Sequence, residues 1–167
     1  MNMKKYIEKI RDNLIFVVED NEIYSMMFDY ILSKYRNFNV IRYTSAEECL
    51  QNIHMKPDIV ILDYYLPQMN GLETLKQIKS YDPEIVVVAL TGQDDINVVK
   101  RLLDAGVNKY FQKAKDPIEK ICRTVDNMLL TIQAKKRDKE RMRTIKNIGV
   151  IVLFFALAII LFYSIYY

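Results

Sequence analysis

Residues 58–71 read DIVILDYYLPQMNG, and the first part of this stretch decides the fold. Residues 58–62 form a nearly continuous apolar run, which is typical of a strand buried on both faces of a parallel sheet. Similar runs lie at residues 14–18 and 85–90, and a weaker one lies at residues 109–112. A more polar run at residues 39–43 is typical of an edge strand.

Stretches with helical spacing of apolar residues separate these strands. The residues are Ile23, Met26, Met27, Tyr30 and Ile31, then Cys49, Leu50 and Ile53, then Leu72, Leu75 and Ile78, then Val98, Val99, Leu102 and Leu103. Ser45 and Glu48 predict a capping box at the second helix, and Gly106 is typical of the end of the fourth. A last helix is expected to begin at Asp116 and Pro117. This alternation predicts an α/β fold in (βα)5 order, a doubly wound parallel sheet with helices on both faces.

Charged and hydroxyl side chains stand at the ends of the predicted strands. In chain order they are Glu19, Asp20, Asp63, Thr91 and Lys113. In an open parallel sheet, functional groups collect outside the carboxyl ends of the strands, near the point where the strand order reverses. With the strand order 2-1-3-4-5, the first and third strands are neighbours at that point. The three carboxylates then converge.

Converging carboxylates need positive charge nearby, because a like-charged pair at about 4 Å costs about 4 kcal/mol at an effective dielectric constant of about 20. Oxygen ligands open to water suit Mg²⁺, and Lys113 supplies a second positive charge. A metal ion and an ammonium group together neutralise the oxygens of a phosphoryl group while a carboxylate attacks its phosphorus. Asp63 is the expected nucleophile.

Over residues 12–133 the chain resembles the response regulator receiver domain of two-component signalling. The resemblance rests on the acidic pair Glu19 and Asp20, on residues 58–71 as quoted, on residues 90–92 (LTG), and on Tyr110 three positions before Lys113. It implies a flavodoxin-like fold and a histidine kinase or phosphotransfer protein as partner.

The resemblance also implies a role for each site residue. Asp63 would be the phosphoacceptor, with Thr91 and Lys113 in contact with the phosphoryl group. Mg²⁺ would be bound by Asp63, by Glu19 and Asp20 directly or through water, and by the backbone carbonyl of Tyr65. Tyr110 would be an aromatic switch that turns inward when Thr91 moves, although by itself it also fits a half-buried strand residue. A separate hypothesis is that the side chains of Tyr65 and Gln93, two positions beyond Asp63 and Thr91, flank the approach of a hydrolytic water. The family usually has proline, often cis, where this chain has Ala114.

Residues 148–167 carry no charge. About 20 helical residues at 1.5 Å each span about 30 Å, the thickness of the bilayer core. Tyr163, Tyr166 and Tyr167 would form an interfacial belt. The alternative is a buried core helix. We expect a transmembrane helix and, because the sequence stops there, a single-pass tail anchor without an output domain.

Residues 135–147 are basic. They hold Lys135, Lys136, Arg137, Lys139, Arg141, Arg143 and Lys146 against Asp138 and Glu140. A nucleic-acid patch or a solvated helix are alternatives, but no DNA-binding module follows, so we expect no nucleic acid as partner. The position before an apolar segment favours anionic lipid head groups, with the preceding residues in the cytoplasm. The expected parts are a receiver domain at 1–134, a basic juxtamembrane segment at 135–147 and a transmembrane helix at 148–167 in a bacterial inner membrane.

The composition fits one globular domain in a reducing compartment. The chain has 167 residues, of which 51% are hydrophobic and 27% charged, and its two cysteines lack disulfide or metal spacing. Residues 1–13 lack the apolar run of a signal peptide.

The leading functional hypothesis is a membrane-held signalling switch, not an enzyme, which contacts a membrane-resident effector or a second copy of itself when phosphorylated. A scaffold that binds partners regardless of phosphorylation is the alternative. An aspartate-nucleophile phosphatase of the haloacid-dehalogenase type is a further alternative, but that family has a second Asp two residues after the nucleophile. Here that position is Tyr65.

Overall fold

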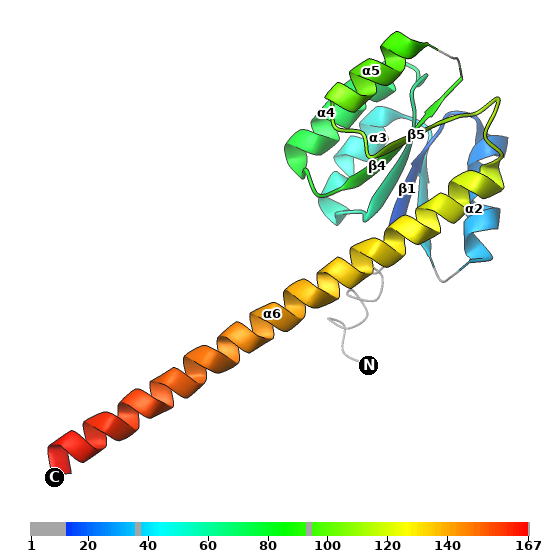
Figure 1. Cartoon of the computed structure of the whole chain (residues 1–167). Coiled ribbons are helices and arrows are strands. Elements are labelled where there is room, and N and C mark those ends of the chain that lie inside the picture. Colours follow the sequence, from blue (N-terminus) through cyan, green and yellow to red (C-terminus); the bar gives the residue numbers. More distant parts are fainter. Residues whose placement is uncertain (1–12, 36–37, 93–94, 167) are drawn as a thin grey trace. The chain divides into compact units, whose positions relative to one another are not determined.

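A computed structural model describes residues 13–35, 38–92 and 95–166, with side chains as far as Leu161. The chain divides after Leu129 into two units. The first unit is an α/β fold, and the second is the continuation of one long helix (Figure 1).

Within the described residues, the sheet of the first unit has five parallel strands in the order β2-β1-β3-β4-β5. The strands are β1 (Leu14–Val18), β2 (Asn39–Tyr43), β3 (Ile59–Asp63), β4 (Val86–Thr91) and β5 (Lys109–Gln112). The helices are α2 (Glu22–Ser33), α3 (Ala46–Gln51), the short 3₁₀ helix η1 (Ile53–Met55), α4 (Gly71–Tyr81), α5 (Ile96–Asp104) and α6 (Ile118–Tyr166). The predicted fold class and strand order are confirmed.

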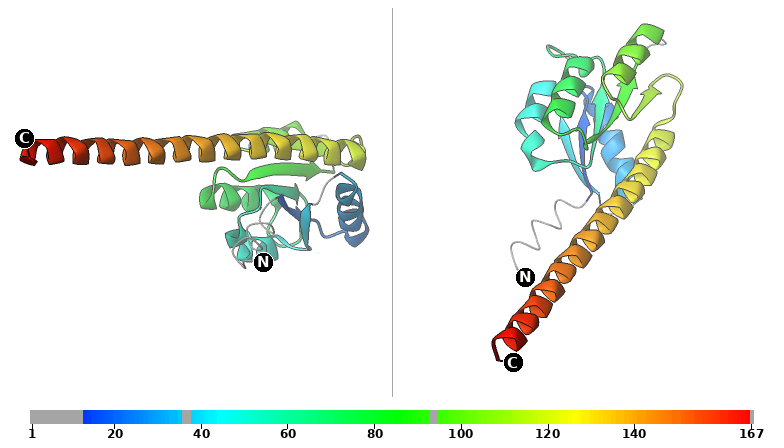
Figure 2. Two further views of the ribbon diagram at one scale, coloured as in Figure 1. Left: turned by 90° about the horizontal axis from the view of Figure 1, so that it is seen from below. Right: turned by 60° about the vertical axis from the view of Figure 1, so that its left-hand side comes forward.

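Successive strand residues point to opposite faces, so each central strand supplies two cores. Phe16 and Leu62 belong to the core under α3, α4 and α5, together with Leu75 and Leu102. The alternate strand residues are also fully buried, for example Ile15, Val17, Ile59 and Ile61. They face the layer of α2 and the first turns of α6 (Figure 1), and Figure 2 shows this layering from two further sides.

The register brings the carboxyl ends of the strands to one edge. Val18 pairs with Leu62, and Asp63 pairs with Leu90. Thr91 pairs with Gln112, immediately before Lys113. The predicted site residues therefore leave the sheet at one level.

The local signals at the helix ends largely operate as predicted. The Ser45 hydroxyl accepts the Glu48 N–H at 3.3 Å, while the Glu48 carboxylate accepts the Thr44 N–H at 3.4 Å. Gly106 follows α5 with φ +85°, a conformation that costs glycine little. The last helix was predicted to begin at Asp116 and Pro117, and in the structure α6 begins at Ile118, directly after them. The Asp116 carboxylate accepts the Gln112 N–H in the preceding turn.

The apolar spacing identified α2 as a helix but marked mainly its solvent side. Of the predicted stripe, Ile23, Met26, Met27 and Tyr30 are exposed and Ile31 is buried; the other residues through which α2 packs are Ser25, Phe28 and Leu32. The helix carries apolar side chains on two faces. The face with Phe28 and Leu32, which are both fully buried, is the one that packs. Both cysteines are free and buried, and burial raises the pKa of Cys49 to about 12.

α6 is 49 residues long, and its first turns pack through Ile118, Ile121, Val125 and Leu129. The basic segment and residues 148–161 belong to the same helix, and the described side chains from 148 to 161 are all exposed. Among the described residues, α6 is the one helix long and apolar enough to cross a membrane. The predicted belt of Tyr163, Tyr166 and Tyr167 lies outside the described side chains.

Gly71 is required by a close backbone approach at the start of α4. A Cβ on Gly71 would press on the carbonyl oxygen of Asp63 and lie 2.7 Å from Tyr64 Cα. We expect Gly71→Ala to lower the free energy of unfolding by about 2 kcal/mol, the scale of overpacking a core. Urea unfolding of the full chain in detergent micelles, followed by circular dichroism, measures this. Gly92→Ala is the control, because among the described residues the nearest atoms to its added Cβ are ring carbons of Tyr65, at 3.8 Å. Equal unfolding midpoints for wild type and Gly71→Ala would contradict the close approach.

Candidate functional site

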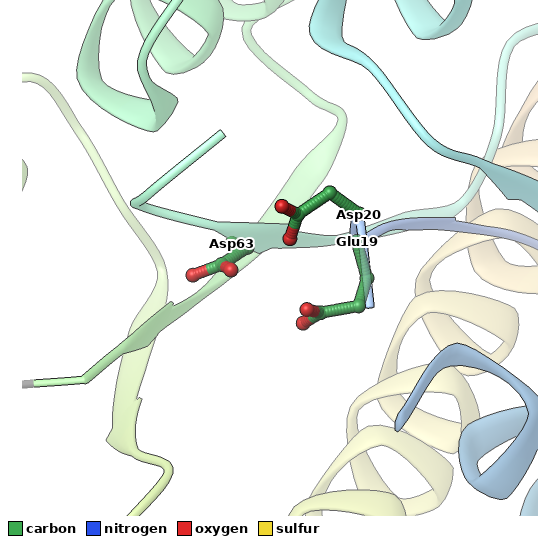
Figure 3. Close-up of side chains that lie close together, drawn as sticks. All are labelled: Glu19, Asp20 and Asp63. Atoms are coloured by element: carbon green, nitrogen blue, oxygen red, sulfur yellow. The ribbon is translucent and has the colours of Figure 1, made fainter. Parts of the chain in front are cut away.

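The three predicted carboxylates meet at the carboxyl ends of β1 and β3. Figure 3 shows Glu19, Asp20 and Asp63 directed toward a common space, and one carboxylate oxygen of each residue lies within 4.8 Å of those of the other two. Glu19 and Asp63 are buried, whereas Asp20 is exposed. The site therefore has a buried floor and one side open to water.

Lys113 supplies the positive charge of this site. Its Nζ lies 2.6 Å from Glu19 Oε2 and 2.6 Å from Asp63 Oδ2. The Lys113 N–H donates to the Thr91 carbonyl at 2.8 Å, which ties the end of β5 to β4. One ammonium group thus links the ends of β1, β3 and β5.

Burial and ion pairing shift the pKa values of these groups. Burial raises the pKa of Glu19 and of Asp63, because it disfavours the charged carboxylate, and the hydrogen bonds from Lys113 offset only part of that rise. Burial acts to lower the pKa of Lys113, but its hydrogen bonds with Asp63 and Glu19 outweigh this and raise it. Lys113 therefore stays protonated at the site.

The second oxygen of Asp63 is held by the loop that follows β3. The Tyr65 N–H donates to Asp63 Oδ1 at 3.2 Å, so both carboxylate oxygens have a donor from the chain. Tyr65 is exposed, and its ring lies next to Gly92, where an added Cβ would stand 3.8 Å away. Tyr65 thus forms one wall beside Asp63. Gln93, predicted to share that role, lies outside the described residues.

Thr91 and Tyr110 lie on the neighbouring strands β4 and β5. Thr91 is buried, and its hydroxyl donates to the Phe111 carbonyl at 3.5 Å. Tyr110 is half-buried and packs against the core. The two predicted switch residues are thus joined through the backbone of β5.

The turn after β5 sets the position of Lys113. The Gln112 carbonyl accepts the N–H groups of Lys115 and Asp116, at 3.0 and 2.8 Å, and the Asp116 carboxylate accepts the Gln112 N–H at 2.9 Å. Ala114 lies in this turn, and the peptide bonds among the described residues are trans. Asp116 was not predicted to matter here, although an Asp next to proline is a common turn signal.

The charge balance and the donor set fit a divalent cation. Three carboxylates face one ammonium group, which leaves an excess of negative charge. The candidate ligands are all oxygen atoms, and exposed Asp20 leaves room for water ligands, as Mg²⁺ prefers. Glu19, Asp20 and Asp63 could therefore hold a metal ion.

Comparison with known proteins identifies relatives of this chain. The family described as response regulator receiver domain matches residues 15–126. The response regulator protein VraR of Staphylococcus saprophyticus is 32% identical over 118 residues, which cover 68% of this chain and 56% of VraR. A protein of Thermotoga maritima named cyclic di-GMP phosphodiesterase is 31% identical over 99 residues, covering 59% of this chain and 26% of that protein.

The fold has a solved counterpart at lower sequence identity. The crystal structure of a response regulator receiver domain protein from Clostridium thermocellum matches with a TM-score of 0.65 and 22% identity, covering 72% of this chain and 97% of that chain. The chain spans about half the length of VraR and about a quarter of the phosphodiesterase. The matched region is thus one part of those relatives, and the phosphodiesterase activity is named for a longer protein.

Removing the Lys113 charge should destabilise the fold in a way that Mg²⁺ reverses. Lys113→Met would leave buried Glu19 and Asp63 without their cation, and we expect a loss of roughly 3 kcal/mol in the free energy of unfolding. Excess MgCl₂ should restore more stability to this variant than to wild type. Urea unfolding with EDTA and with MgCl₂ measures both effects.

Lys120→Met is the matched control for this prediction. Lys120 pairs with Asp116 at 2.7 Å on the surface, so its loss should cost less than about 1 kcal/mol. Similar losses for the two variants, or a Lys113→Met protein indifferent to Mg²⁺, would contradict the role of Lys113.

Proposed function

Because this chain belongs to the response regulator receiver family, we propose that it accepts a phosphoryl group on Asp63 from a histidine kinase or phosphotransfer protein. It then signals through protein contacts that depend on phosphorylation. Its chemistry is limited to its own phosphorylation and dephosphorylation. The proposed parts are a receiver domain at 1–134, a basic juxtamembrane segment at 135–147 and a transmembrane helix at 148–167.

The observation that carries this proposal is the buried Asp63 carboxylate, held between Lys113 Nζ at 2.6 Å and the Tyr65 N–H at 3.2 Å. One Asp63 oxygen attacks the phosphorus of a phosphohistidine and forms an acyl phosphate. The P–N bond breaks, and its electron pair returns to the donor histidine nitrogen. The carboxylate enters this step as an oriented nucleophile.

The other residues have roles in binding the phosphoryl group. Once Asp63 carries the phosphoryl group, the Lys113 ammonium donates to one phosphoryl oxygen and the Thr91 hydroxyl donates to another. Glu19, Asp20 and the Tyr65 carbonyl would hold Mg²⁺ together with Asp63. When bound, Mg²⁺ neutralises charge on the transferring phosphoryl group. The convergence of the three carboxylates within 4.8 Å supports this assignment.

Signalling follows from the movement of Thr91. To reach a phosphoryl group, the Thr91 hydroxyl gives up the Phe111 carbonyl, to which it donates at 3.5 Å. That movement leaves space beside β5, and the Tyr110 side chain shifts from its half-buried conformation toward an inward one. The surface formed by α5, β5 and the start of α6 then changes. A partner that reads this surface distinguishes the two states.

We also propose that residues 148–167 anchor the protein in the bacterial inner membrane, with the receiver in the cytoplasm. The support is that the described side chains of residues 148–161 are uncharged and exposed, and large ones such as Phe154 and Leu157 need apolar surroundings. The basic segment adjoins this stretch and suits anionic head groups. A membrane-resident effector or a second copy of the chain is then a partner at high local concentration.

Asp63→Asn tests the phosphoacceptor. Wild-type protein treated with acetyl phosphate should gain one phosphoryl group only when Mg²⁺ is present, as measured by intact mass spectrometry. The side-chain amide of the variant cannot form an acyl phosphate, so labelling should be lost. Asp20→Asn should keep Asp63 but slow labelling about tenfold or more by weakening Mg²⁺ binding. Undiminished labelling of Asp63→Asn would refute the assignment, and signalling that persists in this variant would favour the phosphorylation-independent scaffold.

The membrane anchor is tested by extraction and truncation. The full chain should stay in the membrane pellet after an alkaline wash, because burial of the apolar helix in lipid does not depend on charge. A chain that lacks residues 148–167 should move to the soluble fraction and keep Asp63 phosphorylation. Release of the full chain by alkali would show that this helix does not span the bilayer.

A further inference from the structure

Tyr24 closes the site on the side of α2. This residue lies in the first turn of α2, and Lys113 Nζ stands 5.0 Å from the centre of its ring. The ammonium group therefore has two carboxylates at 2.6 Å and an aromatic face as its third neighbour. A lysine ammonium is attracted to the electron-rich face of an aromatic ring at such distances.

The helix fixes this ring without help from Lys113. The backbone N–H of Tyr24 donates to Asn21 Oδ1 at 3.0 Å, and Asn21 thereby caps α2. The ring packs edge to face on Phe28, with centroids 5.2 Å apart and an interplanar angle of 89°. Phe28 is fully buried, so it anchors the ring to the core. The Tyr24 ring is thus packed against its own helix, whereas Lys113 has a flexible four-carbon stem.

We propose that Tyr24 is a positioning residue, whose ring confines the Lys113 ammonium beside Asp63 and Glu19. From that position the ammonium group can donate hydrogen bonds to the oxygens of a phosphoryl group on Asp63, a consequence that rests on the proposed function. Burial raises the pKa of Tyr24, so its hydroxyl stays neutral and the attraction comes from the ring. Phenylalanine at position 24 should therefore still position the Lys113 ammonium, whereas an aliphatic side chain should not.

The first experiment measures Asp63 labelling by acetyl phosphate and Mg²⁺ in the full chain in detergent micelles. Tyr24→Leu and Tyr24→Met should each slow labelling about fivefold, and Tyr24→Phe should stay within about twofold of wild type. Tyr30→Leu is the matched control, because Tyr30 on the same helix stacks with Lys34, at 3.9 Å, away from the site. Wild-type rates in both aliphatic variants, or slow labelling by Tyr24→Phe, would overturn the proposal.

The second experiment asks whether Tyr24 acts through Lys113, with Mg²⁺ alone as the probe. Lys113 competes with a cation for Glu19 and Asp63, so a less confined ammonium competes less well. Calorimetric titration should show that the Tyr24→Leu substitution lowers the Kd for Mg²⁺ about threefold when Lys113 is present. The same substitution in a Lys113→Ala background should leave that Kd unchanged. Equal changes in the two backgrounds would assign Tyr24 a general structural role instead. This readout needs no phosphorylation, so a wild-type protein that takes up no phosphoryl group would refute the proposed function and leave the Tyr24 test intact.

Discussion

The ammonium group of Lys113 is the constraint on which the site depends. Glu19 and Asp63 can lie buried side by side because one positive charge stands 2.6 Å from each of them. That charge comes from the end of the last strand of the sheet, so the arrangement requires the β1, β3, β4 and β5 register to be correct. The Thr91 carbonyl and the turn closed by Asp116 then fix where Lys113 leaves the sheet.

The neighbouring strands and helices position the site residues at this edge of the sheet. β1 and β3 are neighbours, so their terminal carboxylates meet, and α2 begins shortly after β1. This short connection brings Tyr24 to the site. On the other side, Gly71 allows α4 to start against the backbone of Asp63 and Tyr64, which holds the loop that donates the Tyr65 N–H. Backbone packing and charge placement thus reinforce each other.

Much of the site could be predicted because its charged and hydroxyl residues stand at the ends of strands, which the sequence marks as apolar runs. Asp63 and Thr91 were recognisable as residues at the ends of apolar runs, and the strand order brings their ends to one edge. The side of α2 that packs was not predictable, since both of its faces are apolar, and Phe28 is chosen by contact with the sheet. Tyr24 was hidden for a related reason. Its meaning depends on a lysine far along the chain, and sequence spacing within a helix carries no trace of that contact.

A crystal structure of the chain with Mg²⁺ and beryllofluoride would test the central claim most directly. We expect beryllofluoride bonded to an Asp63 oxygen, with Lys113 Nζ and the Thr91 hydroxyl in hydrogen-bond contact with its fluorine atoms. Mg²⁺ should lie among Glu19, Asp20 and Asp63. A structure in which Lys113 still bridges Glu19 and Asp63, with no beryllofluoride on Asp63 at saturating concentration, would contradict the phosphoacceptor site.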